Sequence, residues 1–208
     1  MIINQMPTKT MKPHTQDLSL IGQQFFYGIS VKRNYRKAFY YLLQAANIGY
    51  IHAQNLVGYL YDQGLGVEKD KQLASFWYEQ AAKSDHREAL YNLALLYEKG
   101  DGVKVNLRKA FSLYKRAADL GDASAQCNLG IMYLDGLGIK RNVSQGIKWL
   151  RKAAQKGDGK AQYNLGLAYL NGEGVKKNSR NARIWLGKAA ITGNKKAFAV
   201  LKALNNST

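Results

Sequence analysis

Apolar residues recur every three or four positions in short segments of the chain, and each segment ends at a glycine. This spacing places the apolar side chains on one face of a helix. The unit at residues 125–160 has two such faces. The first carries Ala125, Leu129, Met132 and Tyr133, and the second carries Gly146, Trp149, Ala153 and Ala154. The pattern predicts two amphipathic helices in this unit.

The two-helix pattern returns every 36 residues. Alanine marks the period, at Ala53, Ala89, Ala125, Ala161 and Ala197. The repeating units are 17–52, 53–88, 89–124, 125–160 and 161–196, and a half-unit follows at 197–204. A single unit cannot bury both apolar faces, so we expect neighbouring units to stack. Residues 1–16 lie outside the pattern, and we expect them to form a disordered tail.

Glycine and asparagine mark the turn between the two helices of a unit. Gly136 and Gly138 follow the first helix, where glycine tolerates the positive φ of a tight turn. Ile139 comes next, and we expect it to pack into the core. Asn142 then stands where a helix N-cap belongs. Its equivalents in the other units are Asn34, Asp70, Asn106 and Asn178.

A small residue inside the first helix indicates close packing. Gly58, Gly130 and Gly166 occupy the same position in their units. Glycine inside a helix costs up to about 1 kcal/mol relative to alanine. Its recurrence at one position predicts that another helix passes close by.

The repeat pattern AQxNLGxxYxxGxGVxxNxxxAxxWxxKAAxxG resembles the Sel-1-like repeat family, which is related to tetratricopeptide arrays. Tetratricopeptide repeats proper have about 34 residues and lack the G-x-G-V turn. The resemblance implies a curved superhelix that acts as a protein-interaction scaffold, mostly without enzymatic activity. Many members are bacterial, with roles in adaptor complexes, signalling, host–pathogen contact and immunity against secreted toxins. We therefore predict an all-α, right-handed α-solenoid of five 36-residue helix-turn-helix repeats with a C-terminal cap helix.

The composition excludes several classes of protein. Hydrophobic residues make up 46% of the chain and charged residues 22%, which is typical of a folded domain. A single cysteine excludes a disulfide framework and a multi-thiolate metal site. A cysteine-rich secreted branch of the family carries a β-lactam-related activity, but the cysteine pairs of that branch are absent here. No integral membrane segment and no secretory signal is visible, so we expect a cytoplasmic protein; a secreted effector and a truncated periplasmic protein are the alternatives.

The residue types of common active sites do not form a pattern in this chain. His14, His52 and His86 have no metal-ligand spacing and are interpreted as surface polar residues. The G-x-G elements follow no strand and lack the third glycine of a dinucleotide fingerprint. We therefore expect no catalytic residue, no metal and no cofactor.

The first helices supply the candidate binding residues. One stripe on these helices is more apolar than a solvated face, and the resemblance implies that it lines the concave wall. The alternative is that part of the stripe packs between neighbouring units. The candidate concave residues are Tyr59, Tyr91, Leu95, Cys127, Ile131, Tyr163 and Leu167.

Positive charge is concentrated in the second half of the chain. The formal net charge is +17, and residues 104–208 hold 20 basic and 5 acidic residues. Such asymmetry indicates either a solubilising surface or an anionic partner. The turns and second helices of the last three units form a predicted basic ridge, which we define by nine residues. They are Arg108, Lys109, Arg116, Arg141, Lys148, Arg151, Lys152, Arg180 and Arg183.

The sequence thus favours a non-enzymatic scaffold that binds a protein or peptide, acidic in part, in the concave groove. One alternative is an anion-binding module that uses the basic ridge on nucleic acid, an acidic membrane surface or an acidic protein. A second alternative is an immunity protein against a secreted toxin. The fold alone does not choose among these functions.

Overall fold

Eleven α-helices and no strand form residues 15–206, the part of the chain that the computed structural model describes. Each of the five repeats contributes a first and a second helix, and the last helix follows them. The first helices are α1 (Thr15–Tyr27), α3 (Ile51–Gln63), α5 (Arg87–Lys99), α7 (Ala123–Asp135) and α9 (Gly159–Asn171). The second helices are α2 (Tyr35–Asn47), α4 (Lys71–Ala82), α6 (Leu107–Asp119), α8 (Val143–Gln155) and α10 (Ser179–Ile191), and α11 is Lys195–Asn206.

The helix pairs confirm the predicted all-α fold with five repeats and a C-terminal cap helix. The helix bounds differ slightly from the predicted units. The first helices α3, α5, α7 and α9 begin two residues before the predicted boundaries, and α11 extends beyond 197–204 at both ends. Helix α1 already begins at Thr15, so the last two residues of the predicted tail are helical. Residues 1–14 of that tail lie outside the described part of the chain.

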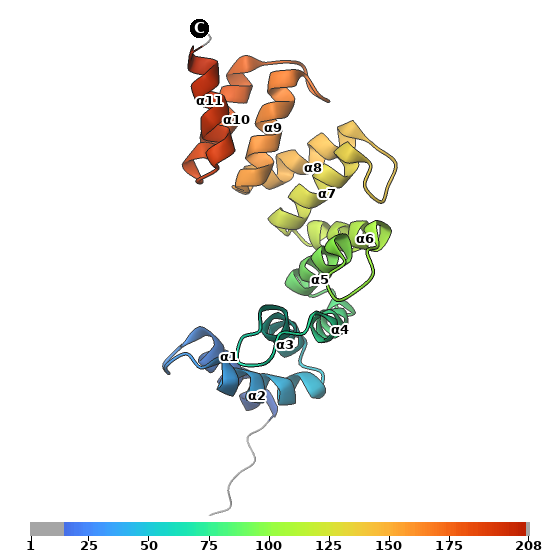
Figure 1. Cartoon of the computed structure of the whole chain (residues 1–208), viewed down its shortest axis with the longest axis vertical. Coiled ribbons are helices and arrows are strands. Elements are labelled where there is room, and N and C mark those ends of the chain that lie inside the picture. The colour runs from blue at the N-terminus through green and yellow to red at the C-terminus, as the bar shows by residue number, and fades with distance from the viewer. Residues whose placement is uncertain (1–14, 207–208) are drawn as a thin grey trace, which may run out of the picture.

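The repeats stack one after another along a curved path, as Figure 1 shows. Each helix packs against the helices that precede and follow it in the chain. Beyond these contacts, α3 also touches α1 and α5 directly. Among residues 15–206, no second helix touches the second helix of the next repeat as extensively as α3 touches α1 and α5. In the first three repeats the first helices are therefore closer together than the second helices, which places them on the inner side of the curve there.

The glycines of each turn have a positive φ that other residues rarely adopt. Gly136 ends α7 in the left-handed conformation with φ 74°, and Gly138 has φ 70°. A Cβ on Gly138 would overlap the carbonyl oxygen of Leu107, at the start of α6 in the preceding repeat. This turn therefore rests directly on the backbone of its neighbour. Ile139 is 38% exposed, so the prediction that it packs into the core is wrong; Leu137 of the same turn packs there instead.

Side-chain caps begin the second helices, as the sequence predicts. Asn142 Oδ1 accepts a hydrogen bond from the backbone N–H of Gln145 at 3.0 Å, and Asn34 does the same for Lys37 at 3.0 Å. The first helices also have caps, which the sequence did not reveal. Asp122 Oδ1 accepts from the backbone N–H of Ala125 at 2.7 Å. These acceptors satisfy N–H groups that no helical carbonyl can reach.

The glycines inside the first helices allow the second helices to approach closely. A Cβ on Gly58 would lie 2.8 Å from Cδ1 of Tyr78, and one on Gly130 would lie 2.9 Å from Cγ of Leu150. Tyr78 and Leu150 are fully buried. The predicted close approach is therefore confirmed, and it occurs within one repeat. No helix in the described chain is both long and apolar enough to cross a membrane.

Two glycine variants test the backbone contact between repeats. Both Gly138→Ala and Gly157→Ala place an alanine in the unfavourable left-handed conformation, because φ is 70° and 91° at these positions. Only Gly138 would drive its new Cβ into a neighbour, since nothing lies within 4 Å of a Cβ on Gly157. We expect Gly157→Ala to cost about 1–2 kcal/mol of unfolding free energy and Gly138→Ala about 1–3 kcal/mol more. Thermal unfolding followed by circular dichroism measures both; equal losses would contradict the contact.

Candidate binding groove on the first helices

Three hollows open on the exposed face of the first helices. The largest, here called the aromatic hollow, has a volume of about 480 Å³ and lies between α1, α3 and α5. Its lining residues are Phe26, Tyr27, Arg33, Tyr35, Asn55, Leu56, Tyr59, Glu88, Tyr91, Asn92 and Asp122. A second hollow of about 280 Å³ lies between α5, α7 and α9, and a third of about 230 Å³ lies between α3 and α5.

The three hollows form one continuous groove because they share wall residues. Tyr91 lines both the aromatic hollow and the second hollow. Tyr59 lines both the aromatic hollow and the third hollow. Leu95 and Lys99 line both the second and the third hollows. We call their union the groove; it crosses the first helices from the first repeat to the start of α9.

Aromatic rings from separate elements build the wall of the aromatic hollow. Phe26, in the last turn of α1, meets Tyr59 of α3 edge to face with ring centres 5.8 Å apart. Phe26 also meets Tyr35, at the start of α2, with ring centres 5.7 Å apart. Tyr59 remains 38% exposed. The wall is therefore firmly packed from behind and still presents aromatic surface to a ligand.

Asn55 is the unusual polar residue of the aromatic hollow. It lies on α3, is 7% exposed, and its Oδ1 atom has no hydrogen-bond partner. A buried acceptor without a donor costs about 1–3 kcal/mol. Tyr91, Cys127 and Tyr163 occupy the same position in the later repeats, so the repeat pattern does not require a polar group here.

The groove is more acidic than the rest of the molecule. Its walls hold six acidic residues: Asp62, Glu88, Glu98, Asp101, Asp122 and Asp158. They hold four basic residues: Arg33, Lys71, Lys99 and Lys160. The whole chain, in contrast, has 31 basic and 14 acidic residues. The pKa of Tyr91 responds to this charge: burial raises it, and the carboxylates of Asp122 and Asp158 raise it further.

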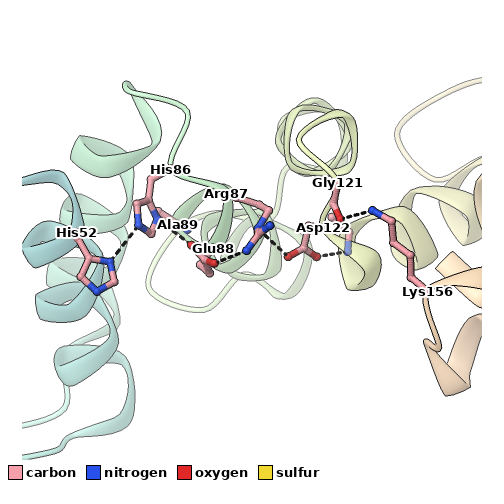
Figure 2. A network of polar contacts seen from close by, with 9 residues as sticks. His52, His86, Arg87, Glu88, Ala89, Gly121, Asp122 and Lys156 are labelled. Carbon is pink, nitrogen blue, oxygen red and sulfur yellow. Dashed lines mark hydrogen bonds and ion pairs between the residues drawn. The ribbon is translucent and has the colours of Figure 1, made fainter. Parts of the chain in front are cut away.

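A line of polar contacts runs along the starts of α3, α5 and α7, as Figure 2 shows. His52 Nδ1 lies 3.3 Å from His86 Nε2. Arg87 donates from Nη2 to Glu88 Oε1 at 2.9 Å, and its Nε lies 4.0 Å from Asp122 Oδ2. One repeat further on, Lys156 donates to the carbonyl oxygen of Gly121 at 2.7 Å. Glu88 and Asp122 belong both to this line and to the wall of the aromatic hollow.

His86 caps α5 and titrates unlike an exposed histidine. The backbone N–H of Ala89 donates to His86 Nδ1 at 3.4 Å when this nitrogen is unprotonated; Glu88 Oε2 lies equally close to it, at 3.4 Å. Burial lowers the pKa of His86; Glu88 opposes this shift, whereas His52 and Arg87 add to it. The neutral imidazole can then donate from Nε2 to His52. Of the surface histidines expected from the sequence, His86 is instead a helix cap, and His52 belongs to the first turn of α3. His14 lies outside the described residues.

The predicted concave residues divide between the groove and the core. Tyr59, Tyr91 and Leu95 line the groove. Cys127 also lines the second hollow, but it is only 1% exposed, so it lies at the base of the groove and offers little surface. Burial is also the main reason why the pKa of its thiol is raised.

The other three predicted residues are half-buried. Ile131 packs against the core cluster around Leu150, and Tyr163 packs against the cluster around Leu186. These two fit the alternative that part of the stripe packs between helices and repeats. Leu167 is half-buried on α9. The structure thus places Tyr59, Tyr91, Leu95 and Cys127 in the walls of the groove and Ile131 and Tyr163 in packing contacts.

Many residues of the predicted basic ridge already have partners in the fold. Ion pairs join Lys109 to Glu79 at 3.0 Å, Arg116 to Asp85 at 2.6 Å and Arg141 to Glu173 at 2.9 Å. Each of these pairs links two consecutive repeats. Lys152 lies 4.2 Å from the ring centre of Trp149, and Arg183 donates to the carbonyl oxygen of Leu204 at 2.9 Å.

The remaining ridge residues face solvent. Arg151 donates to Tyr169 Oη at 3.4 Å, which is a long contact. Arg108, Lys148 and Arg180 are exposed and make no hydrogen bond or ion pair within residues 15–206. In the same part of the chain, no three His, Cys, Asp or Glu side chains lie close enough to hold a metal ion.

Stacked helix pairs of nearly equal length, joined by G-x-G turns in four of the five repeats, define an α-solenoid repeat protein. The Sel1 repeat model matches residues 20–50, 51–86, 87–122, 123–158 and 159–194. The chain therefore belongs to the Sel1 repeat family. Sel1 repeat proteins are generally protein-interaction scaffolds. A comparison with curated proteins finds no match.

Solved structures agree with this family. A Sel1 repeat protein from Oxalobacter formigenes is 32% identical, with a TM-score of 0.85; the match covers 92% of this chain and 78% of that one. The protein c5321, a protective antigen present in uropathogenic Escherichia coli strains displaying an SLR fold, is 31% identical with a TM-score of 0.84. That match covers 90% of this chain and 40% of c5321, so this chain spans less than half of that protein. The immunity protein Pa5087 from Pseudomonas aeruginosa is 22% identical with a TM-score of 0.55, covering 89% of this chain and 68% of that one, which shows the fold alone.

Exchanging the caps of α5 and α7 tests the titration of His86. The folded-state pKa of His86 is lower than its ordinary value of about 6.5. Its contribution to stability is therefore present above that value and is lost as pH falls through the folded-state pKa. We expect His86→Asp to stabilise the protein at pH 5 by about 1 kcal/mol, and by less at pH 8.

Asp122→His is the matched variant, because it places a histidine in the α7 cap. It should destabilise the protein more at pH 5 than at pH 8. Urea unfolding at the two pH values measures both variants. If each variant shifts the unfolding midpoint equally at both pH values, the His86 cap does not titrate as described.

Proposed function

We propose that this protein is a non-enzymatic scaffold that holds an extended segment of a partner protein in the groove. The observation that carries the proposal is the continuity of three hollows across consecutive first helices, with the exposed aromatic surface of Tyr59 and the half-buried ring of Tyr91 in the wall. Aromatic residues at the centre of an interface often contribute most of the binding energy. Hollows that follow one another along the repeats suit an extended chain with successive side chains in successive hollows.

The basic ridge supports an anionic partner less well. Lys109, Arg116 and Arg141 hold neighbouring repeats together, so their charges are already balanced by carboxylates. The free ridge residues Arg108 and Arg180 remain available for weak, salt-sensitive contacts. The likeness to the immunity protein Pa5087 is one of fold, so it adds no support for an immunity role.

The absence of catalysis is part of the same proposal. Cys127 is 1% exposed and its raised pKa keeps the thiol protonated, which disfavours a nucleophilic role. His86 is engaged as a helix cap and as a partner of His52. Both residues therefore have structural explanations.

Two sets of variants distinguish the groove from the ridge. Tyr59→Ala with Tyr91→Ala removes aromatic surface from the groove. Arg108→Glu, Lys148→Glu and Arg180→Glu reverse ridge charges that have no partner in the described fold. Proteins captured from a cell extract by the wild-type chain are first identified by mass spectrometry, and the affinity of each purified partner is then measured by calorimetry. We expect the double tyrosine variant to lose at least about thirtyfold in affinity and the triple variant to keep most of it.

Tyr40→Ala with Phe76→Ala is the control for the loss of two exposed aromatic rings, because both residues lie on second helices and are 62% and 49% exposed. This control should bind like the wild type. Melting temperatures confirm that each variant is folded. If the triple variant loses binding and the double tyrosine variant keeps it, the partner docks on the ridge and the groove proposal is wrong.

A further inference from the structure

Hydrogen-bond acceptors gather at the aromatic hollow, and one of them has no donor in the fold. Asn55 Oδ1 is buried and has no partner. The carboxylate of Glu88 lines the same hollow, and its side chain is 50% exposed. Asp122 caps α7 with Oδ1, while its Oδ2 meets Arg87 Nε only at 4.0 Å. These acceptors favour a ligand that brings donors.

Lysine and arginine side chains combine donors with an apolar stem. Their charged ends donate hydrogen bonds and accept none. Their methylene groups can lie along apolar surface while the charged end reaches a polar one. Aromatic rings also attract cations through their faces. The hollow offers the matching surfaces, because Phe26, Tyr59 and Tyr91 stand beside Asn55 and Glu88.

Arg33 already shows that these rings accept a guanidinium group. Its Cζ atom lies 5.8 Å from the ring centre of Tyr35, and Nη1 lies 3.5 Å from Tyr35 Oη. Arg33 and Arg87 are the cations that face the hollow or its rim from α1–α2 and α5. Neither of them makes a hydrogen bond to Asn55 Oδ1.

The electrostatic field in the hollow disfavours an anion. Burial raises the pKa of Tyr27, and the carboxylate of Glu88 raises it further. The pKa of Tyr91 is raised in the same way by burial and then by Asp122 and Asp158. The carboxylates therefore oppose the ionisation of both tyrosines. They oppose the binding of an anion in the hollow for the same electrostatic reason.

We propose that the aromatic hollow is a subsite for a lysine or arginine side chain of the bound segment. The stem of that side chain lies against Tyr59 and Phe26, and its charged end donates to Asn55 Oδ1 and Glu88. The partner segment is thus basic at this point, in contrast to the partly acidic partner expected from the net charge. This inference rests on the proposed function of the groove.

Two small probes test the charge preference without knowledge of the partner. N-acetyl-L-arginine amide and N-acetyl-L-citrulline amide have nearly the same shape, and only the first is charged. Each is titrated into the ¹⁵N-labelled full chain, and the amide resonances of residues around Asn55, Tyr59 and Tyr91 are followed by NMR. We expect the arginine probe to shift these resonances and to bind at least about fivefold more tightly than the citrulline probe.

Three variants locate the effect. Glu88→Gln should remove most of the preference for arginine, and Asp119→Asn should not, because it removes the same charge from the second helix α6. Asn55→Leu should also reduce the preference and at the same time raise the melting temperature, since it removes a buried acceptor that has no partner. A residue with a purely structural role would not produce these two opposite effects.

The outcomes separate this inference from the proposed function. If the citrulline probe binds as tightly as the arginine probe, or if the arginine shifts lie outside the hollow, the cation subsite is wrong. The groove itself would still stand if Tyr59→Ala with Tyr91→Ala abolishes partner binding. If the arginine probe binds as expected while that variant keeps the partner, the subsite stands and the proposed docking of the partner in the groove is wrong.

Discussion

Contact between the backbones of consecutive repeats is the constraint on which the rest of the structure depends. The turn at Gly138 rests on the carbonyl group of Leu107, and the turn at Gly66 rests in the same way on the backbone of Tyr35 and Arg36. No side chain larger than hydrogen fits at these positions. Each turn thereby fixes the distance between its repeat and the preceding one. This fixed distance sets the spacing of consecutive repeats along the stack.

The stack creates surfaces that no single repeat possesses. The aromatic hollow needs Phe26 from the first repeat, Tyr59 from the second and Glu88 from the third. Ion pairs such as that of Arg116 with Asp85 likewise join side chains of consecutive repeats. Positive charge thus serves partly to join repeats, while a larger share of acidic side chains lines the groove. The two faces of the molecule therefore present different chemistry to a partner.

The candidate site lies where the repeats depart from their common pattern. Asn55 replaces the tyrosine or cysteine of later repeats, and His86 replaces the aspartate that caps α7 and α9. Neither replacement is required by packing, because the usual residues serve the other repeats. Asn55 even leaves a buried acceptor without a partner. Gln126 Oε1 and Gln162 Oε1 in later repeats also lack a partner, so it is the place of Asn55 in the aromatic hollow that connects its free acceptor with binding.

The sequence by itself determined the main features that depend on local order along the chain, apart from the caps of the first helices. The 36-residue period, the G-x-G turns, the Asn or Asp caps of the second helices and the close helix approach at Gly58 could all be predicted, because each is a contact within one or two turns or between fixed positions of one repeat. Tertiary structure alone decided which residues of different repeats meet. It buried Cys127, exposed Ile139, engaged Arg116 with Asp85, and brought Phe26 beside Tyr59. The physical reason is that the rotation between repeats depends on side-chain packing across their interface, and a sequence period does not record that rotation.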